Sequence, residues 1–290
     1  MPYLVLAAGV LVVSTASILI RLAQAEGVPS LTIAALRLGL AAMVLIPLVT
    51  LRSRRELAAL AGCDMLLAIG SGALLAVHFW SWIASLEYTS VASSTVLVTT
   101  NPLWVGLASL ALLRERLPTA AVLGIGLSLL GTVITFSAET TVATPSPRPA
   151  LGNSLALVGA AAASGYLLIG RALRSRVGLL AYVGLAYGAA AALLGTAAVF
   201  ARSPVAGYSS EAWLYLAALA LGPQLLGHTS FNWALRRMSA TFVALAILGE
   251  PIGSAILAWL LFGERFGPLQ LAGFALVLLG IALGARGERK

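Results

Sequence analysis

Charged residues are scarce in this chain of 290 residues. Asp, Glu, Lys and Arg make up 10% of the sequence, 60% of the residues are hydrophobic, and the mean hydropathy is +0.99. A soluble protein of this length needs more polar residues to cover its surface, so that class is excluded. Apolar stretches long enough to cross a bilayer indicate a polytopic membrane protein instead.

Cysteine, histidine and catalytic motifs are also scarce or absent. The single cysteine, Cys63, excludes an internal disulfide and a thiolate metal cluster. The two histidines, His78 and His228, lie in different halves of the chain, so we expect no metal site. Because the sequence contains no GxSxG, HExxH or P-loop motif, we expect no enzyme activity, no cofactor and no ATP-driven pumping by this chain alone.

Basic residues outnumber acidic ones, 18 against 10, and only one of them is a lysine. They lie in short connections between apolar runs and form no patch interleaved with aromatic residues. We therefore expect the lipid bilayer as a partner and no nucleic acid. With the N-terminus inside, thirteen basic residues lie on the inner side and four on the outer side. This asymmetry predicts a multi-pass protein of the bacterial inner membrane with both termini in the cytoplasm.

Ten apolar segments have the length of a membrane-spanning helix. The sequence therefore predicts an all-α polytopic membrane protein with ten transmembrane helices. The predicted spans cover residues 2–23, 29–51, 60–86, 90–113, 117–137, 151–172, 178–201, 211–235, 239–262 and 267–285.

The chain divides into two related halves at a polar, proline-rich segment. We predict an N-terminal five-helix repeat at 1–137, a periplasmic linker at 138–150 and a C-terminal five-helix repeat at 151–290. An odd number of helices per repeat inverts the second repeat in the membrane, which is a transporter architecture. At an offset of 149, the residues Leu86, Ser90, Pro102, Leu112, Glu115, Arg116, Gly124 and Gly131 match Leu235, Ser239, Pro251, Leu261, Glu264, Arg265, Gly273 and Gly280. At an offset of 150, the residues Gly9, Ser14, Arg21 and His78 match Gly159, Ser164, Arg171 and His228.

Two predicted spans are interrupted near their middle, one by Asn101-Pro102 and the other by Glu250-Pro251. A broken helix that carries a polar group inside a membrane is a functional-site hypothesis by default. A charge at the depth of Glu250 would cost about 2.5–3.5 kcal/mol if it faced lipid, so its carboxyl should face the bundle interior. Pro251 also frees a carbonyl near Ile247. Glu250 either lies at the transport path or serves a structural hydrogen-bonding role.

Asn101 is the counterpart of Glu250 in the first half. Ser94 shares its helix face and Trp104 continues that face. These residues either line the path or pack against neighbouring helices through small and amide side chains.

Polar and aromatic side chains also share one face of the third predicted helix, at His78, Ser81, Trp82 and Ser85. This face suits a ligand with an aromatic or apolar side chain and a polar head. The alternative is a tryptophan at the outer membrane interface and a histidine bonded to a neighbouring carbonyl.

The eighth predicted helix carries a similar face. Gln224, His228 and Phe231 follow the break at Pro223, and the same two interpretations apply to them.

Further candidates lie on the first, second and sixth predicted helices. Ser14, Ser17 and Tyr166 can add hydroxyls to the same cavity, although packing is the favoured interpretation. Arg37 can hold a substrate carboxylate or pair with Glu250, but an outward, snorkelling orientation along its helix is favoured.

These features resemble the drug/metabolite transporter superfamily in its ten-helix, EamA type. The resemblance rests on the two five-helix halves, the NP and EP breaks, the sequence RERL echoed by GERFG, and the glycine-rich last helix. It covers essentially the whole chain, and bacterial aromatic amino acid exporters are the most similar members. It implies a secondary transporter with inverted repeats and a central cavity, which exports amino acids or related metabolites.

We therefore expect alternating-access export of aromatic or other neutral amino acids. Amphipathic drugs, cationic amines with Glu250 as counter-charge, and other metabolites are alternative cargoes. A membrane scaffold or an intramembrane enzyme is the least favoured alternative. The sequence leaves energy coupling and oligomeric state open and is compatible with a monomer. The predicted binding residues are His78, Ser81, Trp82, Ser94, Asn101, Trp104, Ser14, Ser17, Tyr166, Gln224, His228 and Glu250, with helix breaks at Pro102, Pro223 and Pro251.

Overall fold

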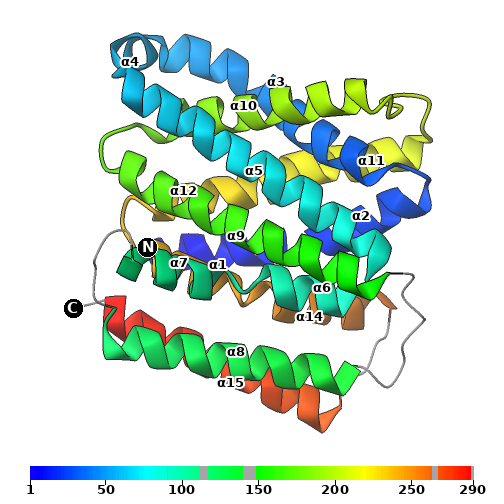
Figure 1. Ribbon diagram of the computed structural model, residues 1–290, viewed down its shortest axis with the longest axis vertical. Helices are drawn as coiled ribbons and strands as arrows, with labels where there is room; N and C mark the ends of the chain where they lie inside the picture. Colours follow the sequence, from blue (N-terminus) through cyan, green and yellow to red (C-terminus); the bar gives the residue numbers. More distant parts are fainter. Residues whose placement is uncertain (90, 112–116, 140–147, 263–266, 289–290) are drawn as a thin grey trace.

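The computed structural model describes residues 1–89, 91–111, 117–139, 148–262 and 267–288, and all regular structure in these ranges is helical (Figure 1). Several predicted features fall outside the described residues: Ser90, Leu112, Arg114, Glu115, Arg116, most of the 138–150 linker, Glu264 and Arg265. The helices are α1 (Pro2–Val13), α2 (Ala16–Ala25), α3 (Ser30–Arg52), α4 (Arg54–Ala59), α5 (Gly62–Tyr88), α6 (Val91–Val98), α7 (Asn101–Ala111), α8 (Thr119–Glu139), α9 (Pro149–Arg174), α10 (Leu179–Phe200), α11 (Ser210–Leu219), the π-helix η2 (Ala220–His228), α12 (Thr229–Ala234), α13 (Ala240–Ile247), α14 (Glu250–Phe262) and α15 (Pro268–Glu288).

Seven helical runs in the described part of the chain are long and apolar enough to cross a membrane. A shorter apolar helix covers Thr119–Ile134. The two remaining predicted spans, 90–113 and 211–235, coincide with α6–α7 and with α11–η2–α12. The chain is therefore a multi-pass, all-helical membrane protein, while the count of ten spans stays a prediction. The seven runs are Pro2–Ala25, Ser30–Arg52, Gly62–Tyr88, Ala150–Arg174, Leu179–Phe200, Ala240–Leu257 and Pro268–Gly287.

The helices lie side by side across Figure 1, with α8 and α15 at one end of the stack and α3 and α10 at the other. Glycines bring α8 and α15 together. A Cβ on Gly131 would lie 2.6 Å from the Gly273 carbonyl oxygen, and one on Gly124 would lie 2.6 Å from the Gly280 oxygen. Such close backbone contact is typical of membrane helices that pack through small residues.

The two predicted mid-span breaks, at Asn101-Pro102 and at Glu250-Pro251, are present. The first interrupted span is divided into α6 and α7, with Asn101 and Pro102 opening α7, and the second into α13 and α14, with Glu250 and Pro251 opening α14. Proline suits the first turn of a helix because its missing N–H has no intrahelical partner there. Short turns close each gap, for example from the Gly249 N–H to the Ala246 carbonyl at 3.0 Å.

The two breaks receive matching contacts from the opposite half of the chain. Ser14 Oγ donates to the Glu250 main-chain carbonyl at 3.1 Å, and Ser164 Oγ donates to the Asn101 carbonyl at 3.3 Å. Each serine hydroxyl also bonds the carbonyl four residues earlier in its own helix, at 2.8 Å in both cases. Each break is thus held to a helix of the other half through a main-chain oxygen of the residue before its proline.

Candidate functional site

A central cavity lies beside the two helix breaks. It offers about 40 Å³ to the centres of water-sized molecules, which is room for a few waters. Both halves of the chain build its walls. The lining residues are Val13, Leu75, His78, Trp82, Val98, Thr99, Asn101, Ala163, Tyr166, Leu167, His228, Phe231, Ile247 and Glu250. Six of the twelve predicted binding residues are among them: His78, Trp82, Asn101, Tyr166, His228 and Glu250.

Aromatic rings form much of the cavity wall. The His78 and Trp82 rings are stacked, with centroids 5.9 Å apart and planes 15° from parallel. The His228 ring lies 6.4 Å from His78 and meets Phe231 edge-on at 5.5 Å. These rings come from α5, η2 and α12, so they gather side chains far apart in sequence. They give the cavity flat apolar surfaces of the kind that bind aromatic groups.

His78 is held in one orientation. Its Nδ1 lies 3.0 Å from the main-chain oxygen of Gly159 on α9. Because a carbonyl only accepts, Nδ1 carries the proton in this contact, and the neutral ring keeps Nε2 as an acceptor. The predicted bond to a neighbouring carbonyl is therefore present, and His78 also borders the cavity, while its part in ligand binding stays a prediction.

Glu250 faces the bundle interior, as its depth in the span predicts. The residue is 7% exposed and opens α14, where the helix dipole favours a negative charge. Its carboxyl borders the cavity, and no residue in the described ranges donates a hydrogen bond to it. The Ser14 hydroxyl bonds the main-chain carbonyl of Glu250 and leaves the carboxyl available.

Asn101, the counterpart of Glu250, is tied into the protein. The amide orientation that satisfies its surroundings donates to the Val98 oxygen at 2.8 Å and to the Ala160 oxygen at 3.2 Å. Asn101 therefore links α6 to α9 while it borders the cavity. The two break residues differ in chemistry because the amide is paired and the carboxyl is open.

A buried polar network supports the opposite wall. Asn232 Nδ2 shares its two hydrogens among three acceptors: the Tyr166 hydroxyl at 2.5 Å, the His228 carbonyl at 2.8 Å and the Tyr187 hydroxyl at 3.2 Å. Tyr187 also contacts Thr229 Oγ1 at 3.3 Å. This network fixes Tyr166 against the π-helix that carries His228.

Arg37 corrects the sequence interpretation, because the favoured snorkelling orientation is wrong. The side chain is 0% exposed and points into the protein from α3, toward α5 and η2. Its Nε donates to Gln224 Oε1 at 2.9 Å, and its guanidinium carbon lies 4.1 Å from the centre of the Phe79 ring. Gln224 therefore holds Arg37 behind the cavity wall and does not line the cavity.

The other predicted binding residues lie outside the cavity lining. Ser81 is buried and donates to the Val77 carbonyl at 2.7 Å. Trp104 is 38% exposed on the outer surface and donates to Thr100 Oγ1 at 3.2 Å. The remaining three are buried serines: Ser14 at the Glu250 break, Ser17 with its Oγ 3.5 Å from that of Ser254, and Ser94 with its Oγ 2.6 Å from that of Ser85. Pro223 lies within η2, where the helix widens to the π form.

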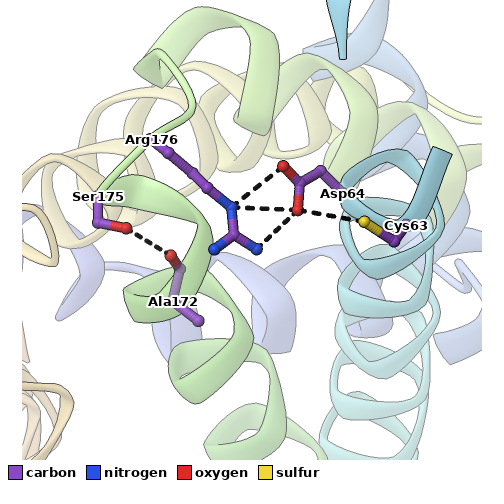
Figure 2. A network of polar contacts seen from close by, with 5 residues as sticks. All are labelled: Cys63, Asp64, Ala172, Ser175 and Arg176. Carbon is purple, nitrogen blue, oxygen red and sulfur yellow. Dashed lines mark hydrogen bonds and ion pairs between the residues drawn. The ribbon is translucent and has the colours of Figure 1, made fainter. Parts of the chain in front are cut away.

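Polar contacts away from the cavity join the start of α5 to the α9–α10 connection. Figure 2 shows Arg176, whose guanidinium forms a two-pronged ion pair with Asp64 at 2.6 Å and 3.1 Å. The hydrogen bond and the charge of Asp64 raise the pKa of the Arg176 guanidinium above its ordinary value. Nearby, Glu56 accepts a hydrogen bond from the Gly178 N–H. These contacts tie the two halves together at one end of the bundle.

Sequence reasoning missed Asn232, Tyr187 and Phe79. Asn232 follows His228 by four residues, so the face carrying Gln224 and His228 contained a signal for it. Tyr187 and Phe79 carry no such signal, because their importance depends on which helices become neighbours. In the described residues, no three His, Cys, Asp or Glu side chains gather at a point that could hold a metal ion.

Comparison with known proteins places the chain in a family. An uncharacterized transporter from Archaeoglobus fulgidus is 26% identical over 203 residues, which is 69% of each chain. A crystal structure of another protein superimposes with a TM-score of 0.80, at 22% identity over 99% of this chain and 97% of that one, and so shows the same fold. The model of the EamA-like transporter family matches residues 1–137 and 150–285. The chain therefore belongs to the EamA-like transporter family, within the drug/metabolite transporter superfamily, and is a multi-pass membrane transporter.

Proposed function

We propose that this transporter is a secondary carrier that exports aromatic or other neutral amino acids across the inner membrane. The observation that carries the proposal is the composition of the central cavity. Its wall combines the rings of His78, Trp82, Tyr166 and His228 with the carboxyl of Glu250. Aromatic faces suit the side chain of such a cargo, and the carboxyl suits its ammonium group.

The proposed architecture is ten transmembrane helices in two inverted five-helix repeats, at 1–137 and 151–290. Two contacts support this architecture. Ser14 donates to Glu250, and Ser164 donates to Asn101. The two serines occupy equivalent positions in the two halves, 150 residues apart, and so do Asn101 and Glu250, 149 residues apart. The family model, which matches two separate segments, supports the same division. Both termini lie in the cytoplasm in this proposal, and the 138–150 linker lies on the periplasmic side.

The small size of the cavity supports alternating access. Room for a few waters is too little for an amino acid, whereas ligand pockets typically measure about 300–1,000 Å³. Cargo therefore enters and leaves only when helices of the two halves move apart. The helix breaks and the π-helix are the places where such movement disturbs the fewest regular hydrogen bonds.

The proposal is tested by counterflow in proteoliposomes that contain only this chain. Vesicles loaded with unlabelled phenylalanine, tryptophan, tyrosine or leucine should take up the labelled amino acid with saturable kinetics. Empty liposomes and liposomes with an unrelated membrane protein serve as controls. Uptake no greater than in empty liposomes for every amino acid would contradict the proposal.

Cationic amines are the second candidate cargo, and the open Glu250 carboxyl is the observation that favours them. An aromatic amine could place its ring against Trp82 and its charge on Glu250. Counterflow of phenethylamine that exceeds that of phenylalanine at equal concentration would favour this candidate.

A further inference from the structure

Buried nitrogen donors without partners gather beside the cavity. In the described residues, Arg37 Nη1, Arg37 Nη2, Gln224 Nε2 and Trp82 Nε1 are inaccessible to solvent and make no hydrogen bond. Arg37 and Gln224 touch through Nε and Oε1, so three of these four donors lie together. Most buried donors in proteins are paired, and an anionic ligand would supply the acceptors that this group of donors lacks.

Glu250 shows the complementary deficit, with an acceptor carboxyl that receives no donor from the described residues. A glutamate and an arginine carry opposite charges when both are ionised. The two side chains nevertheless form no ion pair, because both terminal nitrogens of Arg37 are without a partner. The site therefore combines a cationic side chain with an acidic one, and the ring of His228 both borders the cavity and contacts Phe79.

We propose that Arg37 and Glu250 bind the two ends of a zwitterionic cargo, the guanidinium taking its carboxylate and the Glu250 carboxyl taking its ammonium group. This inference rests on the proposed function and assigns the charge pattern that the carrier selects. A zwitterion compensates both buried charges at once. A cation leaves Arg37 without a partner, and an anion leaves Glu250 without one, so each is bound more weakly.

In this proposal, cargo reaches Arg37 through the part of the cavity wall that η2 forms. Phe79 lies under the guanidinium and meets the His228 ring edge-on at 5.1 Å. In this series of contacts, Phe79 and His228 separate Arg37 from the cavity. Gln224, which anchors Arg37, and His228, which forms the wall, both belong to the π-helix interrupted by Pro223. A shift of η2 therefore moves the wall and the anchor together and exposes the guanidinium to cargo.

The test uses three probes with the same phenyl ring: L-phenylalanine, phenethylamine, which lacks the carboxylate, and 3-phenylpropionate, which lacks the ammonium group. Each competes with labelled phenylalanine in proteoliposomes of the full chain. In the wild type, the amine and the acid should both need at least tenfold higher concentrations for half-inhibition, since each loses one charge-assisted contact.

Three substitutions identify the residues responsible. Arg37→Gln should abolish the preference for phenylalanine over the amine. Glu250→Gln should abolish the preference for phenylalanine over the acid. Gln224→Glu places a carboxylate beside Arg37. This substitution should weaken the binding of phenylalanine at least tenfold while the binding of phenethylamine is retained. Arg21→Gln, at an exposed arginine of α2, is the matched control and should keep wild-type ratios. Ratios measured within one preparation do not depend on how much protein folds.

The outcomes separate this inference from the proposed function. If phenylalanine is transported and the amine or the acid competes equally well in the wild type, the zwitterion site is wrong while the carrier stands. The zwitterion site is also wrong if Gln224→Glu and Arg37→Gln leave one ratio within twofold of wild type. This is the ratio of the half-inhibitory concentration of the amine to that of phenylalanine. If none of the three probes binds and no amino acid is transported, the proposed function fails and this inference fails with it.

Discussion

Arg37 on α3 donates from Nε to Oε1 of Gln224 on η2 at 2.9 Å. This bond joins the buried cation to the π-helix that carries His228. Within the described residues, the guanidinium head also contacts the face of Phe79, with its carbon 4.1 Å from the ring centre. Because a buried charge without hydrogen bonds is strongly destabilising, Gln224 is the main structural support of Arg37.

Replacing Gln224 with leucine should destabilise the protein by about 1.5–3 kcal/mol, the typical contribution of a hydrogen bond to a charged group. Thermal unfolding of the purified protein in detergent measures the effect. Leu226→Ala is the control, because Leu226 is 64% exposed on the same π-helix. Equal losses of stability in the two variants would show that Gln224 does not support Arg37.

The glycine contact between α8 and α15 gives a prediction with a control on the same helix. Gly131→Ala places a Cβ 2.6 Å from the Gly273 oxygen and should cost about 1–3 kcal/mol through overpacking. Gly126→Ala meets nothing within 4 Å and should stabilise the helix by about 0.5–1 kcal/mol. Unfolding temperatures that fall equally in both variants would rule out close packing at Gly131.

The ion pair in Figure 2 should contribute little to stability. Arg176 is 54% exposed and Asp64 12% exposed, so solvent and salt screen their attraction. A double-mutant cycle with Asp64→Asn and Arg176→Gln should give a coupling energy below about 1 kcal/mol, and less at high salt. A larger coupling that persists in high salt would mean that the pair closes this end of the bundle.

The proposed topology can be tested with the single native cysteine. Cys63 is exposed beside Asp64, at the end of α5 that the positive-inside rule places in the cytoplasm. A membrane-impermeant maleimide should label it only after cells are permeabilised. Ser210→Cys in a Cys63→Ser background lies on the proposed outer side and should be labelled in intact cells. The reverse pattern of labelling would show that the proposed topology is wrong and that the chain has the opposite orientation in the membrane.

Most of the helical architecture could be predicted from the sequence. Long apolar runs and prolines near mid-span leave little freedom, because backbone groups in lipid must bond within their own helix. The breaks at Pro102 and Pro251 are therefore where the sequence predicts them. The division of the first span into α1 and α2 was not foreseen, because no proline or glycine stands between Val13 and Ala16.

The site was predictable in part. His78, Trp82 and Glu250 could be found because polar and large aromatic residues are conspicuous in apolar spans. The partner of Arg37 could not be found, because α3 and η2 are neighbours only in space. Helix periodicity gives the face of a residue on its own helix, but it does not say which helix covers that face. The snorkelling interpretation of Arg37 failed for this reason.

In the proposed transport cycle, cargo passes through the cavity beside the two helix breaks. Ala163 lines this cavity, whereas Ala161, two residues earlier on α9, is exposed on the outer surface. The most direct test is phenylalanine counterflow by Ala163→Leu, which fills the cavity, compared with Ala161→Leu and wild type. We predict at least a tenfold loss of flux for Ala163→Leu and flux within twofold of wild type for Ala161→Leu. Equal flux in all three proteins would contradict this prediction.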